Sequence, residues 1–486
     1  MEITYGELCF GVNEKYADEI LVETSVDTTE RGGVEKILSV EAEAKASAVE
    51  LLEGEAEVSG KVNYRLLYLD RQSRLCGLDY FKDFKCRVKG DAVLPGGKCV
   101  ATFLVPDADA VISGEEVELS AVVDVTLRYY GEQNVKAVSG ITEAETLSKE
   151  AVTHRVNVKE RSIELNKIAD VGLGVKKIVL FGTEALPVEV KNEGGAFTAS
   201  GEVKGTILYL NDADEVAELT VSLPYAEAVE EAFDLTARVK SARVILTDDE
   251  AGNVVEVEAT LSLVGTSYEE VKQTVMAAAC GEKSMVEEMR EQKQSVRFVG
   301  RNCYKEGLSG NVALDASGVE TLFVRPGCHA VAEVTVEDGS VKVEGVASFR
   351  VVYGAAEGYR SEKAEFPFAY VLPFAEAKDG MTANVKLTVT DASGILRGKE
   401  VAVTANAFLD VALFEKSVVE YLSEAKEGEP LPESEAGISV YFAERGEDAW
   451  SIAKSMGVLP SVLVKANPFL AEPIEEPRKI LVFRQK

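Results

Sequence analysis

The chain has 486 residues, of which 46% are hydrophobic, and it carries 52 Lys and Arg against 83 Asp and Glu, a formal net charge of −31. Domains of roughly 100–200 residues would give about three or four cores at this length. The negative field repels phosphate backbones, so the composition argues against nucleic-acid binding. No apolar run approaches the roughly 18 residues of a membrane span, and Glu2 and Glu7 stand where a signal peptide carries cations. We therefore expect a cytoplasmic protein without membrane insertion.

The cysteines are odd in number and far apart, and none belongs to a Cys-x-x-Cys pair of the kind that binds zinc or acts in redox chemistry. We expect all of them to be reduced thiols, as is usual in a cytosolic protein. They are Cys9, Cys76, Cys86, Cys99, Cys280, Cys303 and Cys328.

Catalytic candidates are few, because the chain has only two histidines, His154 and His329. Cys328 and His329 could form a thiol nucleophile with its base, but neighbouring residues of a strand point to opposite faces. The acidic groups at 212–214 and 248–250 could bind calcium, yet neither is followed by the Gly and distal Glu of an EF-hand loop. We therefore expect a protein that is not an enzyme, with no catalytic residue, metal or cofactor.

One short pattern occurs three times, in residues 59–68, 200–209 and 344–353. Each copy has a glycine eight positions before a tyrosine, within an apolar stretch. The tyrosines are Tyr68, Tyr209 and Tyr353, which stand 141 and 144 residues apart. A step of that size is the length of a domain, so the pattern predicts tandem copies of one fold, each with a core tyrosine.

Other apolar segments recur in the same order around each tyrosine. Alternation of apolar with polar or small residues at period two predicts strands at 116–127, 254–263 and 400–409, and further strands at 37–44, 177–181 and 320–324. We expect a mainly β protein with three tandem antiparallel β-sandwich-like repeats, at residues 1–152, 153–292 and 293–422. Apolar residues three or four apart at 267–276 and 283–290 favour short helices between the repeats.

A different region follows. Residues 423–437 contain two prolines and many carboxylates, which favours an extended acidic linker. Residues 438–486 read as strand, helix, helix and strand. Asp448 is placed to cap the first helix, Gly457 to end it and Pro460 to start the second. The single tryptophan, Trp450, is expected in the core of so small a domain.

This region resembles a LysM domain: residues 446–453 are similar to the family block Gly-Asp-Thr-Leu-Trp-x-Ile-Ala, and residues 463–468 to Leu-x-x-x-Asn-Pro. The resemblance implies a βααβ fold and assigns its core and binding residues. The core would hold Trp450, Ile452, Leu463 and Asn467, and the two binding loops would present Glu447, Asp448 and Ala449, and Phe469 and Leu470. In place of the usual Thr-Leu stand Asp448 and Ala449, which leaves the scaffold free for a protein partner instead of N-acetylglucosamine chains.

Three such β repeats followed by an acidic linker and a LysM-like domain resemble the SipL-like spore morphogenetic proteins, whose repeat is the SPOCS domain. The resemblance implies a mother-cell protein at the forespore surface or spore coat, an adaptor that binds a SpoIVA-like coat ATPase through its LysM-like domain, with other coat proteins as further partners. Two alternatives stay open. One is a LysM protein that binds peptidoglycan or N-acetylglucosamine oligomers, and the other is a hydrolase carried by a LysM anchor, for which no catalytic set is recognisable.

Overall fold

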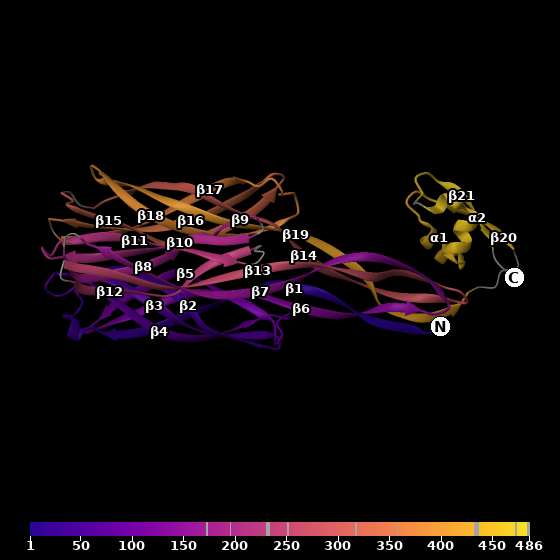
Figure 1. The fold of residues 1–486 in the computed structure, drawn as a ribbon, viewed down its shortest axis with the longest axis horizontal. Helices are drawn as coiled ribbons and strands as arrows, with labels where there is room; N and C mark the ends of the chain where they lie inside the picture. Colours follow the sequence, from indigo (N-terminus) through magenta and orange to yellow (C-terminus); the bar gives the residue numbers. More distant parts are fainter. Residues whose placement is uncertain are drawn as a thin grey trace.

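The computed structural model describes residues 1–171, 174–194, 196–229, 234–249, 252–315, 318–356, 358–431, 437–471 and 474–483. Most of this chain forms long antiparallel strands, and a small domain with helices lies at the C-terminal end (Figure 1). The expected mainly β class is confirmed. In the described residues the strands build three successive β units, each made of two sheets.

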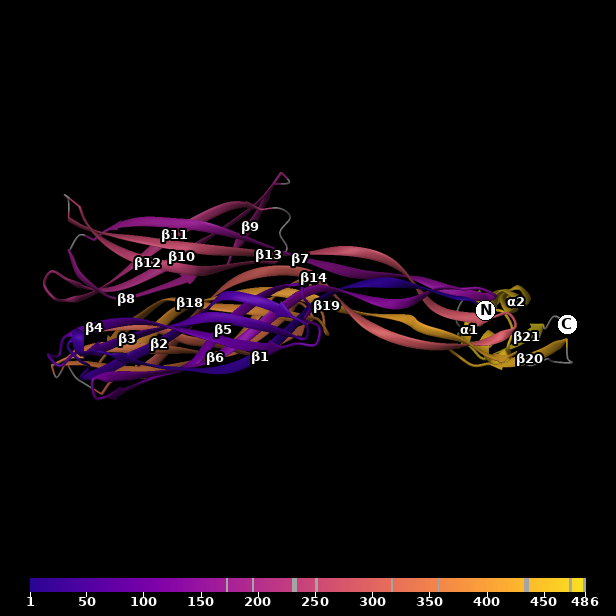
Figure 2. The same cartoon turned by 90° about the horizontal axis from the view of Figure 1, so that it is seen from below.

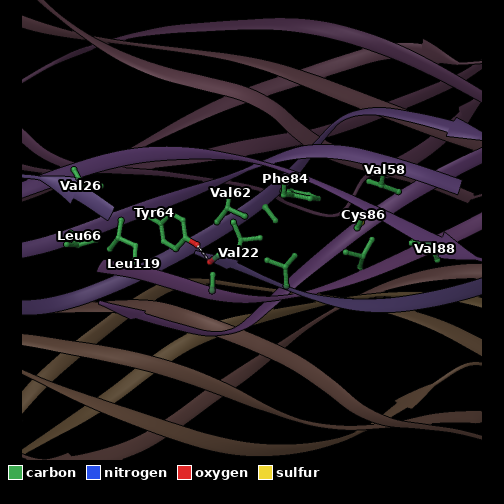
Figure 3. Close-up of a cluster of buried hydrophobic side chains, with 14 of the residues drawn as sticks. Val22, Val26, Val58, Val62, Tyr64, Leu66, Phe84, Cys86, Val88 and Leu119 are labelled. Carbon is green, nitrogen blue, oxygen red and sulfur yellow. Dashed lines mark hydrogen bonds between the residues drawn. The ribbon is translucent and has the colours of Figure 1, made fainter. Parts of the chain in front are cut away.

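The first unit contains the sheets β1-β6-β5 and β2-β3-β4. Its strands are β1 (Ile3–Asp27), β2 (Lys36–Leu52), β3 (Glu55–Leu69), β4 (Leu75–Lys89), β5 (Lys98–Ser113) and β6 (Glu116–Ile141). Side chains alternate between buried and partly or fully exposed along β6 from Val117 to Leu127, as period-two patterning requires. The inward-facing side chains of both sheets, among them Val62, Tyr64 and Leu119, pack together and form one apolar core between the sheets (Figure 3).

The second and third units have equivalent sheet orders. In the second, β12-β13-β7 faces β11-β10-β8, with β9 pairing on β10, and in the third, β14-β19-β18 faces β15-β16-β17. The strands of the second unit are β7 (Ala144–Asp170), β8 (Val175–Ala185), β9 (Glu189–Glu193), β10 (Ala196–Asn211), β11 (Val216–Val229), β12 (Asp234–Asp249) and β13 (Gly252–Gly281). Those of the third are β14 (Ser284–Ala313), β15 (Thr321–Glu337), β16 (Ser340–Ala355), β17 (Gly358–Pro373), β18 (Thr382–Arg397) and β19 (Glu400–Pro430).

One strand pair of each unit runs on beyond its sandwich. We call these outer ends the stem: residues 3–12 paired with 131–141, 144–153 paired with 271–281, and 284–295 paired with 417–430. Figures 1 and 2 show them leaving the body side by side. The stem has its own apolar core, drawn from all three pairs, to which Phe10, Val275 and Tyr421 contribute.

The stem corrects two helix predictions. Residues 267–276 belong to β13 and residues 283–290 largely to β14, so both segments are strands. Apolar side chains four residues apart, such as Val271 and Val275, fit a strand face as well as a helix face, because four is a multiple of two. Pairing with β7 and β19 provides hydrogen-bond partners for the backbone of these segments and directs their apolar side chains into the core of the stem.

The expected linker is also shorter than predicted. Strand β19 continues to Pro430, where Ser284 is its partner, so residues 423–430 are part of the stem and not a linker. Ala425 is buried there despite its acidic neighbours, since alternate positions point to solvent. Residues 432–436 lie outside the described residues.

The C-terminal domain comprises β20 (Ile438–Ala443), α1 (Ala449–Met456), α2 (Pro460–Ala466), the 3-10 turn η2 (Pro468–Ala471) and β21 (Arg478–Phe483). The expected start and stop signals are confirmed. Asp448 caps α1 by accepting a hydrogen bond from the Ser451 amide, Gly457 ends it with φ 62°, and Pro460 opens α2. Strands β20 and β21 pair with each other in antiparallel fashion.

Removing the hydroxyl of Tyr64 should destabilise the first unit. This hydroxyl is buried and donates a 2.6 Å hydrogen bond to the Val22 carbonyl, which joins the two sheets (Figure 3). We expect Tyr64→Phe to lower the free energy of unfolding by about 1–2 kcal/mol, measured by urea denaturation. Tyr80 provides the matched control. It lies opposite Tyr64 on the neighbouring strand β4, is half-buried, and forms no hydroxyl hydrogen bond to a described residue. An equal loss for Tyr80→Phe would contradict this account.

Candidate partner-binding site

Two loops of the C-terminal domain, the ones in which the binding residues were expected, lie against each other. The Gly446 amide donates to the Ile474 carbonyl at 2.8 Å, and the Ile474 amide donates to the Glu447 carbonyl at 2.9 Å. The structure therefore brings the segment before α1 next to the segment after α2. This is the juxtaposition that a two-loop binding site requires.

The side chains of the first loop, however, are used within the domain. Glu447 accepts hydrogen bonds from the Tyr441 hydroxyl and the Glu444 amide, both at 2.7 Å. Burial disfavours the ionised form of Asp448, but hydrogen bonds from the Ser451 amide and hydroxyl outweigh it and lower the pKa of Asp448. Ala449 is buried. These three residues stabilise the loop and the start of α1 and offer little to a ligand.

The second loop presents one aromatic ring. Phe469 is 44% exposed, and the Arg478 guanidinium lies 5.5 Å from its ring centre, whereas Leu470 is only 2% exposed. Leu470 thus belongs to the core and not to a binding surface, because η2 turns it inward.

The expected core residues are placed as follows. Ile452 and Leu463 are buried in the core, and Asn467 joins α2 to β21 by hydrogen bonds to the Leu463 and Leu481 carbonyls. Trp450 differs from the expectation: it is half-buried and lies outside the core cluster. At about 100° per helical residue, position 450 is turned away from the face that carries Ile452.

Most of the exposed large apolar side chains in the described part of the domain lie on the outer face of its sheet, which the sequence analysis missed. Cross-strand pairs place five exposed side chains on this face. They are Ile438, Val440, Phe442, Leu481 and Phe483, with exposed fractions of 60%, 48%, 68%, 45% and 40%. We call these five residues the apolar sheet face. The signal was present in β20, where apolar residues occupy both sets of alternating positions although only one set can face the core.

The charge of the C-terminal region also differs from that of the whole chain. Residues 438–486 carry seven Lys and Arg against six Asp and Glu, within a protein of net charge −31. Lys479 lies opposite Phe442 on the sheet, with its ammonium 5.5 Å from the ring centre. The apolar sheet face is thus bordered by a lysine, in contrast to the acidic body, and exposed apolar patches of this kind are typical of interaction surfaces.

The helical side of the domain rests on the tip of the stem. Lys454 pairs with Glu288, the Ser461 amide donates to Glu145 at 2.9 Å, and the Cys280 thiol contacts the Val458 carbonyl at 3.4 Å. Burial disfavours ionisation of Glu288, but hydrogen bonds, that from Lys454 foremost, outweigh it and lower its pKa. This docking leaves the apolar sheet face uncovered by the described residues.

The remaining candidates from the sequence lie within the β units. Tyr68, Tyr209 and Tyr353 are buried in the cores of the first, second and third units, at 1%, 7% and 0% exposure. Asp214 sits at a turn and pairs with Lys176 at 2.7 Å. In the described part of the chain no group of three or more His, Cys, Asp or Glu could hold a metal ion.

The histidine and cysteine candidates are held in structural contacts. Burial raises the pKa of the Cys328 thiol, and the Nδ1 atom of His329 lies 3.3 Å from the Gly327 carbonyl. His154, one residue beyond the stem on β7, is buried against Ser295 of the stem, and burial lowers the pKa of His154. The thiols of all seven cysteines are free.

The family model described as SipL, SPOCS domain matches residues 33–113 and 322–395. The first segment spans β2 to β5 and the second spans β15 to β18, so each covers the same four strands of its unit. No curated protein and no solved structure matches the chain. The two matches associate the chain with SipL-like proteins and with sporulation. In the described residues, neither α-helix is long and apolar enough to cross a membrane.

Removing the ammonium of Lys454 should loosen the docked domain. The Ser461 amide, at the start of α2, reports on docking because its acceptor is Glu145 of the stem. For a half-buried ion pair worth up to about 1 kcal/mol, Lys454→Met should speed hydrogen exchange at this amide by up to about fivefold at pH 7. The pKa of Glu288 is lowered from 4.5, so the contribution is complete above that pH and is lost as the pH falls through the folded pKa.

Two comparisons control this measurement. Lys465→Met changes an exposed lysine of the same domain and should leave exchange at Ser461 unaltered. The Ile452 amide, which donates to the Asp448 carbonyl within the domain, should exchange at the same rate in both variants. Unchanged exchange at Ser461 in Lys454→Met would rule out the ion pair as a docking contact.

Proposed function

We propose that this protein is a non-enzymatic adaptor of spore coat assembly. Its three β units serve as SPOCS-like scaffold repeats, and its C-terminal domain, a LysM-like βααβ fold, binds a SpoIVA-like coat ATPase. The observation that carries the proposal is the SPOCS match at equivalent strands of the first and third units. The proposed location is the mother-cell cytoplasm, at the forespore surface.

Two observations support the repeat interpretation. The second unit has no family match, yet its sheets have the same strand order as those of its neighbours. Its Tyr209 occupies the core position that Tyr68 and Tyr353 occupy in the other two. The order of β20, α1, α2 and β21 likewise supports a LysM-like fold for the C-terminal domain.

We place partner binding on the apolar sheet face and not in the loops. Exposed aromatic and aliphatic side chains that become buried in a complex supply most of the binding energy of an interface. Phe442 is one of the two aromatic residues of this face and the most exposed of the five. The loop residues Glu447, Asp448 and Ala449 are instead engaged within the domain, which agrees with a scaffold that has exchanged sugar binding for protein binding.

Glycan binding is the second candidate, and Phe469 is the observation that favours it. Its ring is 44% exposed in the turn that follows α2, where it could stack on a sugar. Under this alternative, N-acetylglucosamine oligomers would bind the protein and Phe469→Ala would abolish that binding.

Replacing Phe442 should separate partner binding from folding. We expect Phe442→Ser to weaken capture of a purified SpoIVA-like ATPase by at least about tenfold, or 1.4 kcal/mol, because an aromatic anchor of the interface is lost. The affinity for the ATPase would be measured by surface plasmon resonance with the full-length protein immobilised. Phe81→Ser on β4, where the ring is 60% exposed, is the matched control and should bind normally.

A chain ending at Leu431 completes this test. Loss of ATPase capture by the truncated chain would support the C-terminal domain as the docking module. Full capture by both the truncated chain and Phe442→Ser would overturn the assignment. Titration of the full-length protein with N-acetylglucosamine oligomers, with and without Phe469→Ala, distinguishes the glycan alternative.

A further inference from the structure

A cavity of about 300 Å³, partly open to solvent, lies where the three units meet. Its walls come from the inner sheets alone: from β1, β5 and β6 of the first unit, β12 and β13 of the second, and β18 and β19 of the third. The cavity lies close to the inner end of the stem. On β1, Lys15 lines the cavity while Val12 belongs to the stem, and on β13, Thr266 lines the cavity while Val271 belongs to the stem.

The cavity is rich in cations although the protein is strongly acidic. Four basic side chains line it, and two carboxylates, Asp234 and Asp410, accompany them. The basic residues are Lys15, Arg128, Arg238 and Lys386. Asp410 is already neutralised, because Arg301 holds both of its oxygens at 2.6 and 2.7 Å. The lining therefore has an excess of positive charge.

Three of these cations connect the units in a cycle. Arg238 of the second unit donates to the Ala101 carbonyl of the first at 2.7 Å, and Lys386 of the third donates to the Ala237 carbonyl of the second at 3.0 Å. Arg128 of the first donates to the Asn384 side chain of the third at 2.8 Å. Arginine has five N–H donors and lysine three, so each side chain retains donors beyond the one it uses here.

Crowding of like charges away from bulk water is costly unless counter-charge is supplied. The effect is visible at Lys386, whose pKa is lowered to about 8 by burial and, next, by Arg238. Burial likewise raises the pKa of Asp234, a carboxylate of the lining that forms no ion pair with a described residue, and so disfavours its ionised form. Asp234 is therefore a weak source of the missing negative charge.

We propose that this cavity binds a small oxyanion of the phosphate class, held by Arg128, Arg238 and Lys386, one from each unit. Multiple charge-assisted hydrogen bonds from guanidinium and ammonium groups are the usual way in which proteins hold phosphate. With a water occupying about 30 Å³, the cavity admits such an anion together with several waters. The anion would bind the three units to one another, independently of what the C-terminal domain binds.

Inorganic phosphate is the probe, used with the full-length protein at pH 7. Equilibrium dialysis with radiolabelled phosphate should show saturable uptake of one phosphate per chain, and phosphate should raise the thermal midpoint relative to chloride at equal ionic strength. Lys386→Met should weaken binding by at least about tenfold, because one of the three cations is lost. Lys399→Met, at the exposed turn between β18 and β19, should leave it unchanged.

Three results would overturn the proposal. They are no saturable uptake by the unaltered protein, equal affinity in Lys386→Met and the unaltered protein, and an equal loss in Lys399→Met. If circular dichroism shows that Lys386→Met does not fold, Arg128→Gln replaces it, since glutamine can still donate to Asn384 while lacking the charge. Unchanged phosphate affinity in a folded Arg128→Gln would then overturn the proposal in the same way.

Discussion

Antiparallel pairing of the three long strand pairs is the constraint on which the rest of the structure depends. β1 stays paired with β6 from Ile3 to Asp27, with one register irregularity near the stem tip, so each strand belongs both to a sandwich and to the stem. A slip of one residue would turn the apolar side chains of both regions to the wrong face. The core of the sandwich and the core of the stem therefore both require the same pairing register of β1 and β6, and each core stabilises the register that the other needs.

The axis shared by the three units passes through two different environments. In the stem, Phe10, Val275 and Tyr421 pack as an apolar core. In the body, cations from each unit surround a cavity. Between them, the rings of Tyr268 and Phe298 stack with centres 5.6 Å apart, and Phe414 meets both edge-on. This aromatic layer lies between the apolar core of the stem and the charged cavity.

The C-terminal domain follows its local sequence signals but exposes a surface that the sequence analysis did not predict. Its capping and turn residues, Asp448, Gly457 and Pro460, form the elements that the sequence predicts. Its two loops lie against each other, as a binding site between them would need, but the polar side chain of Glu447 is hydrogen-bonded within the domain. The described residues leave the apolar sheet face uncovered, while the helical side rests on the stem. These contacts set the orientation of the domain on the stem.

The sequence by itself determined the class of fold, the strands around each recurring tyrosine and the helix ends near the C-terminus, because alternation and capping are local properties. Tertiary structure decided the rest. Whether Val271 and Val275 lie on a helix or a strand depended on a partner strand more than a hundred residues away. The inward turn of Leu470 and the meeting of Arg128, Arg238 and Lys386 depended on packing between distant segments, which no local pattern encodes.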